Sequence, residues 1–325
     1  MNRKILAVGI ILLFIGIGII PTSALDTEKS LPTSRGHWLY VGGSGPGNYT
    51  KIQDAIDNAS NGDTVFVYDD SSPYYETIKI NKSLNLIGEN RDTTIIDGHT
   101  KDCNIEIEAE NVTISDFTIQ NSSRSGILVR RVSHITITNN IIQNNLAEGI
   151  SLTESMYSII NRNIIQNNGG KGISIFLYCR GNTITQNIIE KNKIGIEATI
   201  GGDFHLIISE NKIADSSETG LIIDSAYLSI VTKNNFERNT QNGYITFRCA
   251  YDPPSRYISL FLTKIYSKSL IIINNYWDGT RFFPYIIDAQ IILLPFFAWQ
   301  QTLYYNCWKV DWHPAQEHYD IRGTT

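Results

Sequence analysis

The sequence contains few of the residues that soft metal sites and crosslinked folds require. Its 325 residues include only two Met and six His, whereas soft copper sites use Cys and Met, and other copper sites use clustered His. The four cysteines, Cys103, Cys179, Cys249 and Cys307, are far apart in the sequence, unlike those of a disulfide-rich scaffold. Either Cys249 and Cys307 form one disulfide or all four are buried thiols, so we expect the core to provide the stability.

The chain also lacks a large excess of either charge. It has 27 Lys and Arg against 32 Asp and Glu, a formal net charge of −5 and a pI near 5.7. The basic residues are scattered and form no stripe, which argues against nucleic-acid binding. The glycine-rich segment 42–47 is not followed by the Lys-Ser/Thr pair of a phosphate-binding loop.

Long apolar runs are missing except at the N-terminus. Residues 5–20 are all apolar, follow Arg3 and Lys4, and precede a Pro-Thr-Ser-Ala sequence, which is typical of a secretory signal. The run is shorter than the roughly 20 residues that span a bilayer. We predict a signal peptide at 1–24, a polar tether at 25–36 and an extracytoplasmic location, secreted or at the cell surface. The alternative is an N-terminal anchor that is not cleaved, and we expect no other membrane contact.

A repeated pattern occupies the stretch from Val112 to Trp277. Each repeat has a central, usually Asn, position with apolar residues three before and two after it, and in all but the last a Gly follows eight or nine residues later. The first six repeats are 23 or 24 residues apart, and the last interval is 41. A period in this range indicates stacked units that cannot bury their apolar faces alone. The central positions are Phe117, Asn140, Asn163, Asn187, Asn211, Asn234 and Asn275.

The residues after each Gly alternate strictly between two sides of the chain. Ile150 and Leu152 take one side while Ser151 takes the other, and the same alternation recurs in the neighbouring repeats. Period two with β-branched residues and Asn/Gly punctuation predicts short strands, and the three- and four-residue spacing of a helical repeat is absent. A coil of about 23 residues with two or three short strands is one turn of a parallel β-helix.

The recurring Asn positions have a structural explanation. Asn tolerates left-handed backbone geometry at a corner and bonds nearby backbone groups, and stacked amides bond one another in a ladder. We therefore expect a structural Asn ladder. A second row follows five residues later in each coil. The first row is Asn140, Asn163, Asn187, Asn211, Asn234 and Asn275, and the second is Ser122, Asn145, Asn168, Asn192, Ser216 and Asn239.

One helix is predicted before the first regular coil. Thr50 and Gln53 match a capping box, and Ile52, Ala55, Ile56 and Ala59 line one face. Gly62 ends the helix. Because the first coil of a solenoid has an unpaired edge, we expect this helix to cap it.

Several segments resemble the NosD-like group. They are YVGGSGPGNYTKIQDAIDNASNGDTVFVY, LNLIGENRDTTIIDG, and the closing NNYWDG and DWHPAQEHYDI. The resemblance covers about 37 to 320 and implies a secreted, all-β, single-stranded right-handed parallel β-helix of pectin-lyase-like architecture. We assign 37–283 to the β-helix with its N-terminal cap and 284–325 to an aromatic-rich C-terminal cap. The group includes sugar-active enzymes, surface proteins and an accessory factor for copper-site assembly, so the fold alone does not give the activity.

One pair of carboxylates is a candidate for polysaccharide cleavage. Glu197 and Asp224 project outward on adjacent coils, roughly 8 Å apart by strand geometry, within the range of inverting glycosidases. No basic residue is clearly placed beside the pair in the sequence pattern, and solvated surface carboxylates are the simpler interpretation. The clustered Asp and His motifs of polygalacturonase-type enzymes are absent.

Four aromatic residues are candidates for stacking on sugar rings. Tyr74 and Tyr75 lie in the loop 69–75, and Phe176 and Phe247 lie on outward strand positions. The alternative for the loop is that it packs on the coil.

We expect no metal site and no cofactor. The nearest candidates for metal ligands are His313 and His318 in the C-terminal tail, and the simpler interpretation of this tail is a capping structure. The predicted function is a non-catalytic β-helix protein that binds glycans or envelope components. The alternatives are a polysaccharide hydrolase or lyase, and a NosD-like accessory factor in copper-centre assembly.

Overall fold

The computed structural model describes most of the chain after residue 35. The described residues are 36–99, 102–199, 205–224, 229–251, 271–273, 276–277, 285–295 and 303–311. The predicted signal peptide, Asn275, His313 and His318 lie outside them, as does the tether apart from Gly36, so the structure does not decide these predictions. No helix in the described part of the chain is long and apolar enough to cross a membrane.

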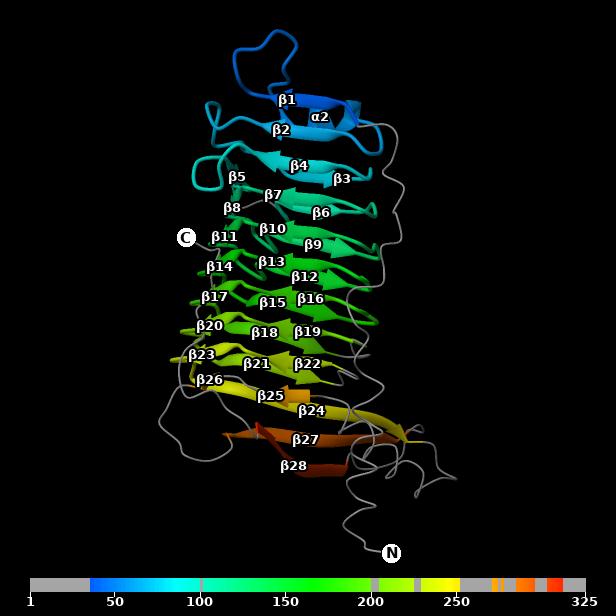
Figure 1. Ribbon diagram of the computed structural model, residues 1–325, viewed down its shortest axis with the longest axis vertical. Helices are drawn as coiled ribbons and strands as arrows, with labels where there is room; N and C mark the ends of the chain where they lie inside the picture. The colour runs from blue at the N-terminus through cyan, green and yellow to red at the C-terminus, as the bar shows by residue number, and fades with distance from the viewer. Residues whose placement is uncertain are drawn as a thin grey trace, which may run out of the picture. The chain divides into compact units, whose positions relative to one another are not determined.

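The described strands form three sheets, which we call A, B and C, and successive coils stack along one axis (Figure 1). Sheet A contains β1 (Trp38–Val41), β2 (Thr64–Val67), β4 (Asn85–Gly88), β7 (Thr113–Ser115), β10 (Thr136–Thr138), β13 (Ile159–Asn161), β16 (Thr183–Thr185), β19 (Ile207–Ser209), β22 (Ile230–Thr232) and β25 (Ile271–Ile273). Sheet B contains β5 (Ile95–Asp97), β8 (Thr118–Gln120), β11 (Ile141–Gln143), β14 (Ile164–Gln166), β17 (Ile188–Glu190), β20 (Lys212–Ala214), β23 (Asn235–Glu237) and β26 (Tyr276–Trp277). Sheet C contains β3 (Ile78–Ile80), β6 (Ile105–Ile107), β9 (Ile127–Arg130), β12 (Ile150–Thr153), β15 (Lys171–Phe176), β18 (Ile194–Thr199), β21 (Thr219–Asp224), β24 (Gln241–Tyr251), β27 (Tyr285–Pro295) and β28 (Leu303–Asp311).

The apolar repeat positions form columns inside the coils. In sheet A, Ile137 pairs with Ile114 and Ile160, and Ile184 pairs with Ile160 and Ile208. Each of these five side chains is at most 1% exposed. The predicted parallel β-helix with one interior column per apolar position is therefore confirmed.

The predicted Asn ladder is present between sheets A and B. The Nδ2 of Asn163 donates to Oδ1 of Asn187 at 3.0 Å, and Asn187 donates in the same way to Asn211 at 3.0 Å. The second row behaves alike, since Asn145 Nδ2 donates to Asn168 Oδ1 at 3.0 Å. The amides also bond backbone groups of neighbouring coils, so each ladder residue joins two corners of the solenoid.

The left-handed residue at the corner is not the ladder Asn, and this expectation was wrong. The residue before it has a positive φ, for example Arg162 at 56° and Gln186 at 57°. The ladder side chain must turn inward to reach its bonding partners, so the preceding residue makes the bend and points outward. Since Arg, Gln, Glu and Lys all occupy this position, the corner tolerates several residue types.

The recurring Gly is required by close packing between coils. A Cβ on Gly172 would lie 2.7 Å from the carbonyl oxygen of Gly195 and 2.6 Å from Cγ2 of Ile189. Gly149 and Gly195 have similar contacts. These glycines therefore allow backbones to approach where sheet C begins.

The helix α2 (Ile52–Asn58) covers the first coil, as predicted, and buries Ile52, Ala55 and Ile56. The expected capping box is not formed, because the first residue before the helix is Lys51 and no side chain at that position caps it. Instead, the carboxylate of Glu76 accepts hydrogen bonds from the N–H groups of Ile52 at 2.9 Å and Gln53 at 3.0 Å. A negative charge there also complements the helix dipole.

At the C-terminal end, β27 pairs in parallel with β24, and β28 pairs with β27 in the antiparallel direction. Strand β27 thus lies between Cys249 on β24 and Cys307 on β28. The side chains of both cysteines lie outside the description, so the Cys249–Cys307 disulfide that the sequence left open stays a prediction.

Candidate functional site

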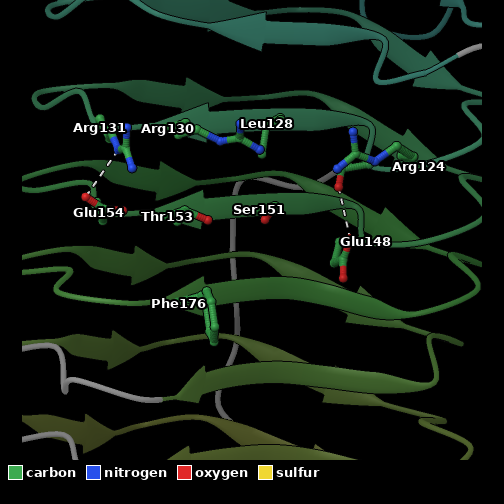
Figure 2. Close-up of a pocket in the computed structure, with 10 residues that line it drawn as sticks. Arg124, Leu128, Arg130, Arg131, Glu148, Ser151, Thr153, Glu154 and Phe176 are labelled. Carbon is green, nitrogen blue, oxygen red and sulfur yellow. Dashed lines mark hydrogen bonds and ion pairs between the residues drawn. The ribbon is translucent and has the colours of Figure 1, made fainter.

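A groove with a volume of about 430 Å³ lies on the outer face of sheet C, across β9, β12 and β15 (Figure 2). We call it the sheet C groove. It is lined by Arg124, Ser125, Leu128, Arg130, Arg131, Glu148, Ser151, Thr153, Glu154 and Phe176. Sequence reasoning proposed only Phe176 among these residues.

Strand register brings the floor of the groove together. Thr153 pairs with Arg130 on one side and with Phe176 on the other. Because inward Ile, Leu and Val residues alternate with these positions, all three side chains turn to the outer face. They form a column along the solenoid axis with one residue per coil, spaced by about 4.8 Å.

The three arginines of the groove differ in their surroundings. Arg131 Nε lies 3.3 Å from Glu154 Oε2, and Arg124 Nη1 lies 3.1 Å from Asp102 Oδ1. The hydrogen bond that Arg124 donates to Asp102 raises the pKa of the Arg124 guanidinium. Arg130 is exposed, and its side chain has no ion pair or hydrogen bond with the residues that the structure describes.

The carboxylates beside the groove are already engaged. Ser125 Oγ donates to Glu148 Oε2 at 3.0 Å, and Glu154 is paired with Arg131. Phe176, at the next coil, keeps 36% of its surface exposed. The groove thus offers an uncompensated guanidinium, a hydroxyl and an aromatic face in line.

The structure corrects one expectation about the proposed carboxylate pair. Lys171 Nζ forms an ion pair with Glu197 Oε2, so a basic residue does lie beside Glu197. Lys171 and Glu197 are neighbours because β15 and β18 are adjacent in sheet C. Glu197 pairs with Ile222, two residues before Asp224. The side chain of Asp224 lies outside the description, so the spacing of the two carboxylates stays a prediction.

The four aromatic candidates have different environments. Tyr74 is only 4% exposed, and its hydroxyl donates to the carbonyl of Tyr68 at 2.7 Å; burial raises its pKa to about 12. Tyr74 therefore packs on the coil and offers no ring face to solvent. Tyr75 is 64% exposed and meets His99 edge-on, with ring centroids 5.7 Å apart. Phe247 lies on β24 opposite Ile291, and its side chain is not described.

The described residues do not fit a metal site. They contain no group of three or more His, Cys, Asp or Glu that could hold an ion. Cys103 and Cys179 are buried free thiols, and burial raises the pKa of Cys103, which disfavours the thiolate that binds metals. His134 stacks on Tyr157 with centroids 5.5 Å apart, a packing role.

Sequence reasoning missed a cluster of aromatic rings on β1 and at β2. We call Trp38, Tyr40, Phe66 and Tyr68 the aromatic patch. Neighbouring ring centroids within it lie 5.1 to 6.3 Å apart. The signal was available in the alternation Trp-x-Tyr and Phe-x-Tyr, which places the rings on one face of two adjacent strands.

Together these features define the class: a right-handed parallel β-helix with a polar groove on one sheet. Residues 53–280 match the family described as NosD, periplasmic copper-binding protein. The match extends over more than half of the chain, and the protein belongs to the NosD family. A periplasmic family is consistent with the predicted extracytoplasmic location.

Solved structures with the same fold include pectate lyase Pel9A, with a TM-score of 0.54 and 12% identity over 82% of this chain and 77% of that one. An alginate lyase from Paenibacillus sp. str. FPU-7 has a TM-score of 0.45 and 13% identity, over 82% of this chain and 95% of that one. At 12% identity the likeness to the pectate lyase is one of fold. No curated protein sequence matches this chain.

Proposed function

We propose that this NosD-family protein is a non-catalytic, extracytoplasmic glycan-binding protein, and that the sheet C groove binds an acidic sugar chain. The observation that carries the proposal is Arg130, which faces the groove without a described carboxylate partner. Guanidinium groups bind carboxylates in a bidentate geometry. A uronate unit of a polysaccharide supplies such a carboxylate.

The other groups of the column suit the rest of a sugar unit. Thr153 can donate to and accept from ring hydroxyls, and the exposed ring of Phe176 gives an apolar surface for the C–H face of a pyranose. Because Arg130, Thr153 and Phe176 follow the solenoid axis, a bound chain would run along that axis. The likeness to a pectate lyase is one of fold, so the ligand is argued from these residues alone.

The absence of catalysis is part of the proposal. Glu148 and Glu154 are held by Ser125 and Arg131, and Lys171 neutralises Glu197. A glycosidase needs two carboxyl groups free to act as acid and as base or nucleophile, whereas each of these glutamates is engaged with a neighbouring side chain. The described residues also do not supply a copper site, so no step through that metal is proposed.

Isothermal titration of the purified protein with an oligogalacturonate, and with its uncharged methyl ester, tests the proposal. We expect saturable binding of the acid and much weaker binding of the ester. Arg130→Ala should weaken binding of the acid about five- to tenfold, since a charge-assisted hydrogen bond contributes about 1 to 1.5 kcal/mol at a solvated site. Arg130→Lys should restore part of the affinity, because Lys keeps the charge but not the bidentate geometry.

Arg180→Ala is the matched control. Arg180 is also exposed, lies outside the groove, and has no ion pair with described residues. Equal losses in the two variants would mean that the ligand responds to general charge, and the groove would not be the site.

A polysaccharide-cleaving enzyme is the second candidate, because Glu197 and Asp224 lie on adjacent strands of the same sheet as the groove. Release of reducing ends from a polysaccharide panel, abolished by Glu197→Gln, would favour it over simple binding.

A further inference from the structure

The outer face of sheet A carries no charged side chain from β1 to β22. Each of these nine strands turns two residues outward, and all are aromatic, aliphatic, hydroxyl or carboxamide residues. Pairing is parallel and one-to-one throughout this part of the sheet, so the outward residues form two straight columns. At about 4.8 Å per strand the columns extend over roughly 38 Å. We call this surface the sheet A face.

The other two sheets do not share this property. Sheet C turns Lys79, Glu106 and Arg130 outward, and sheet B turns Glu190 and Lys212 outward. Charged residues make up 18% of the chain. Their absence from one full side, in a chain that places them on both others, makes the sheet A face chemically distinct.

The aromatic patch occupies the N-terminal end of this face. Trp38 is 53% exposed and Tyr40 is 38% exposed. Their rings are inclined by 29°, and those of Tyr40 and Tyr68 by 25°, with centroids 6.3 and 6.1 Å apart. Phe66 meets Tyr68 edge-on and supports it from the side. Trp38 and Tyr40 thus keep a large part of their surface in solvent, although apolar burial alone would favour covering it.

The charges around the patch select its ligand. Asp69 and Asp70 follow directly after Tyr68, and Asp70 is exposed. Such surroundings repel an acidic polysaccharide or an anionic membrane surface. An uncharged sugar chain fits, because its C–H faces pack on aromatic rings while its hydroxyls meet Thr, Ser and Asn side chains.

We propose that the sheet A face is a second glycan site, which takes an uncharged polysaccharide, with Trp38 and Tyr40 stacking on its sugar rings. The chain or flat surface of the polysaccharide then follows the two uncharged columns along the solenoid. This site differs from the sheet C groove in place and in charge, and it does not depend on the function proposed for that groove.

Co-sedimentation of the purified protein with insoluble uncharged polysaccharides tests the proposal. The panel contains cellulose, chitin, xylan and mannan, with calcium alginate gel as the charged comparison. We expect binding to at least one uncharged polymer, and Trp38→Ala and Tyr40→Ala should each weaken it about tenfold or more, as for aromatic anchors at other interfaces. Trp38→Phe should keep most of the binding, since it retains a ring.

Tyr178→Ala is the control, because Tyr178 is 68% exposed but lies in the loop between β15 and β16, and β16 is six strands from β1 in sheet A. It should bind like the unaltered protein. Binding to soluble fragments of the same polymer should also shift the tryptophan fluorescence, and Trp38→Phe should remove that shift. Circular dichroism of each variant checks that the coils remain folded.

Three results would overturn the proposal. They are no binding to any uncharged polymer, binding that the Trp38 and Tyr40 variants retain, and a loss that Tyr178→Ala shares. Two further outcomes would assign the patch to another occupant: sedimentation with phosphatidylcholine vesicles that Trp38→Ala abolishes, or a dimer in analytical ultracentrifugation that Trp38→Ala dissociates. Arg130→Ala should not affect binding to the uncharged polymers, which separates this site from the sheet C groove.

Discussion

Removing one amide from the Asn ladder should destabilise the solenoid more than any surface change of similar size. The side chain of Asn187 is fully buried. Its Nδ2 donates to Asn211 Oδ1 at 3.0 Å and to the carbonyls of Ile160 and Thr185 at 2.9 and 3.0 Å. Its Oδ1 accepts from the backbone N–H of Asn163 at 2.9 Å and from that residue's Nδ2 at 3.0 Å. Asn187→Ala removes all of these contacts, in which the two Nδ2 hydrogens are shared among three acceptors.

The expected magnitude follows from the groups left without partners. A buried polar group that loses its hydrogen bond costs about 1 to 3 kcal/mol. The N–H of Asn163 loses its acceptor outright, and the carbonyl oxygens each keep a second lone pair. Because such terms are not additive, we expect a loss of about 3 to 4 kcal/mol in the free energy of unfolding, which is a large fraction of the stability of a typical domain.

Equilibrium urea unfolding followed by circular dichroism measures this loss. Asn144→Gly is the control, since Asn144 is exposed and has a φ of 56° that Gly adopts without strain. It should change the free energy of unfolding by no more than about 0.5 kcal/mol. Equal changes in the two variants would refute the assignment of stability to the ladder.

Further predictions concern single contacts. Glu76→Gln should cost about 1 kcal/mol of stability, because it weakens the charged cap on α2; chemical denaturation measures it, and no change would mean that the cap contributes nothing. Gly172→Ala should cost about 1 to 3 kcal/mol, because the added Cβ meets a backbone oxygen that cannot move, and a neutral result in the same assay would contradict the close approach of the coils. Arg238 lowers the pKa of Asp215 through a hydrogen bond, so their pair stabilises the fold above the carboxyl's ordinary pKa, and that contribution is lost as the pH falls through the lowered value. Asp215→Asn should therefore reduce stability slightly at neutral pH and not in strong acid, as thermal unfolding at the two pH values would show; an equal loss at both would contradict the pair.

The solenoid could be predicted from the sequence because its information is local and repeated. The column through Ile137, Ile160 and Ile184 needs only the coil period and the alternation of apolar residues. The ladder needs only the recurrence of Asn at one place in each coil. The prediction that the ladder Asn itself takes the left-handed conformation was wrong. The sequence pattern reflects side-chain chemistry and does not show which residue of the backbone makes the bend.

The helix cap and the groove depend on contacts between coils that no local pattern displays. Glu76 is 24 residues from the N–H of Ile52 that it caps. Arg130, Thr153 and Phe176 come from three coils and meet only through strand register. Lys171 likewise lies beside Glu197 only because their strands are adjacent in sheet C. Stacking the predicted coils in register before looking for sites would have revealed these neighbours.

The most direct test of the proposed function is a titration of the purified protein with oligogalacturonate, followed by analysis of the recovered sugar. Saturable binding that Arg130→Ala weakens and Arg180→Ala leaves unchanged, with the oligosaccharide recovered intact, is the predicted result. Absence of binding, or recovery of shortened sugar chains, would contradict a non-catalytic acidic-glycan site in the sheet C groove.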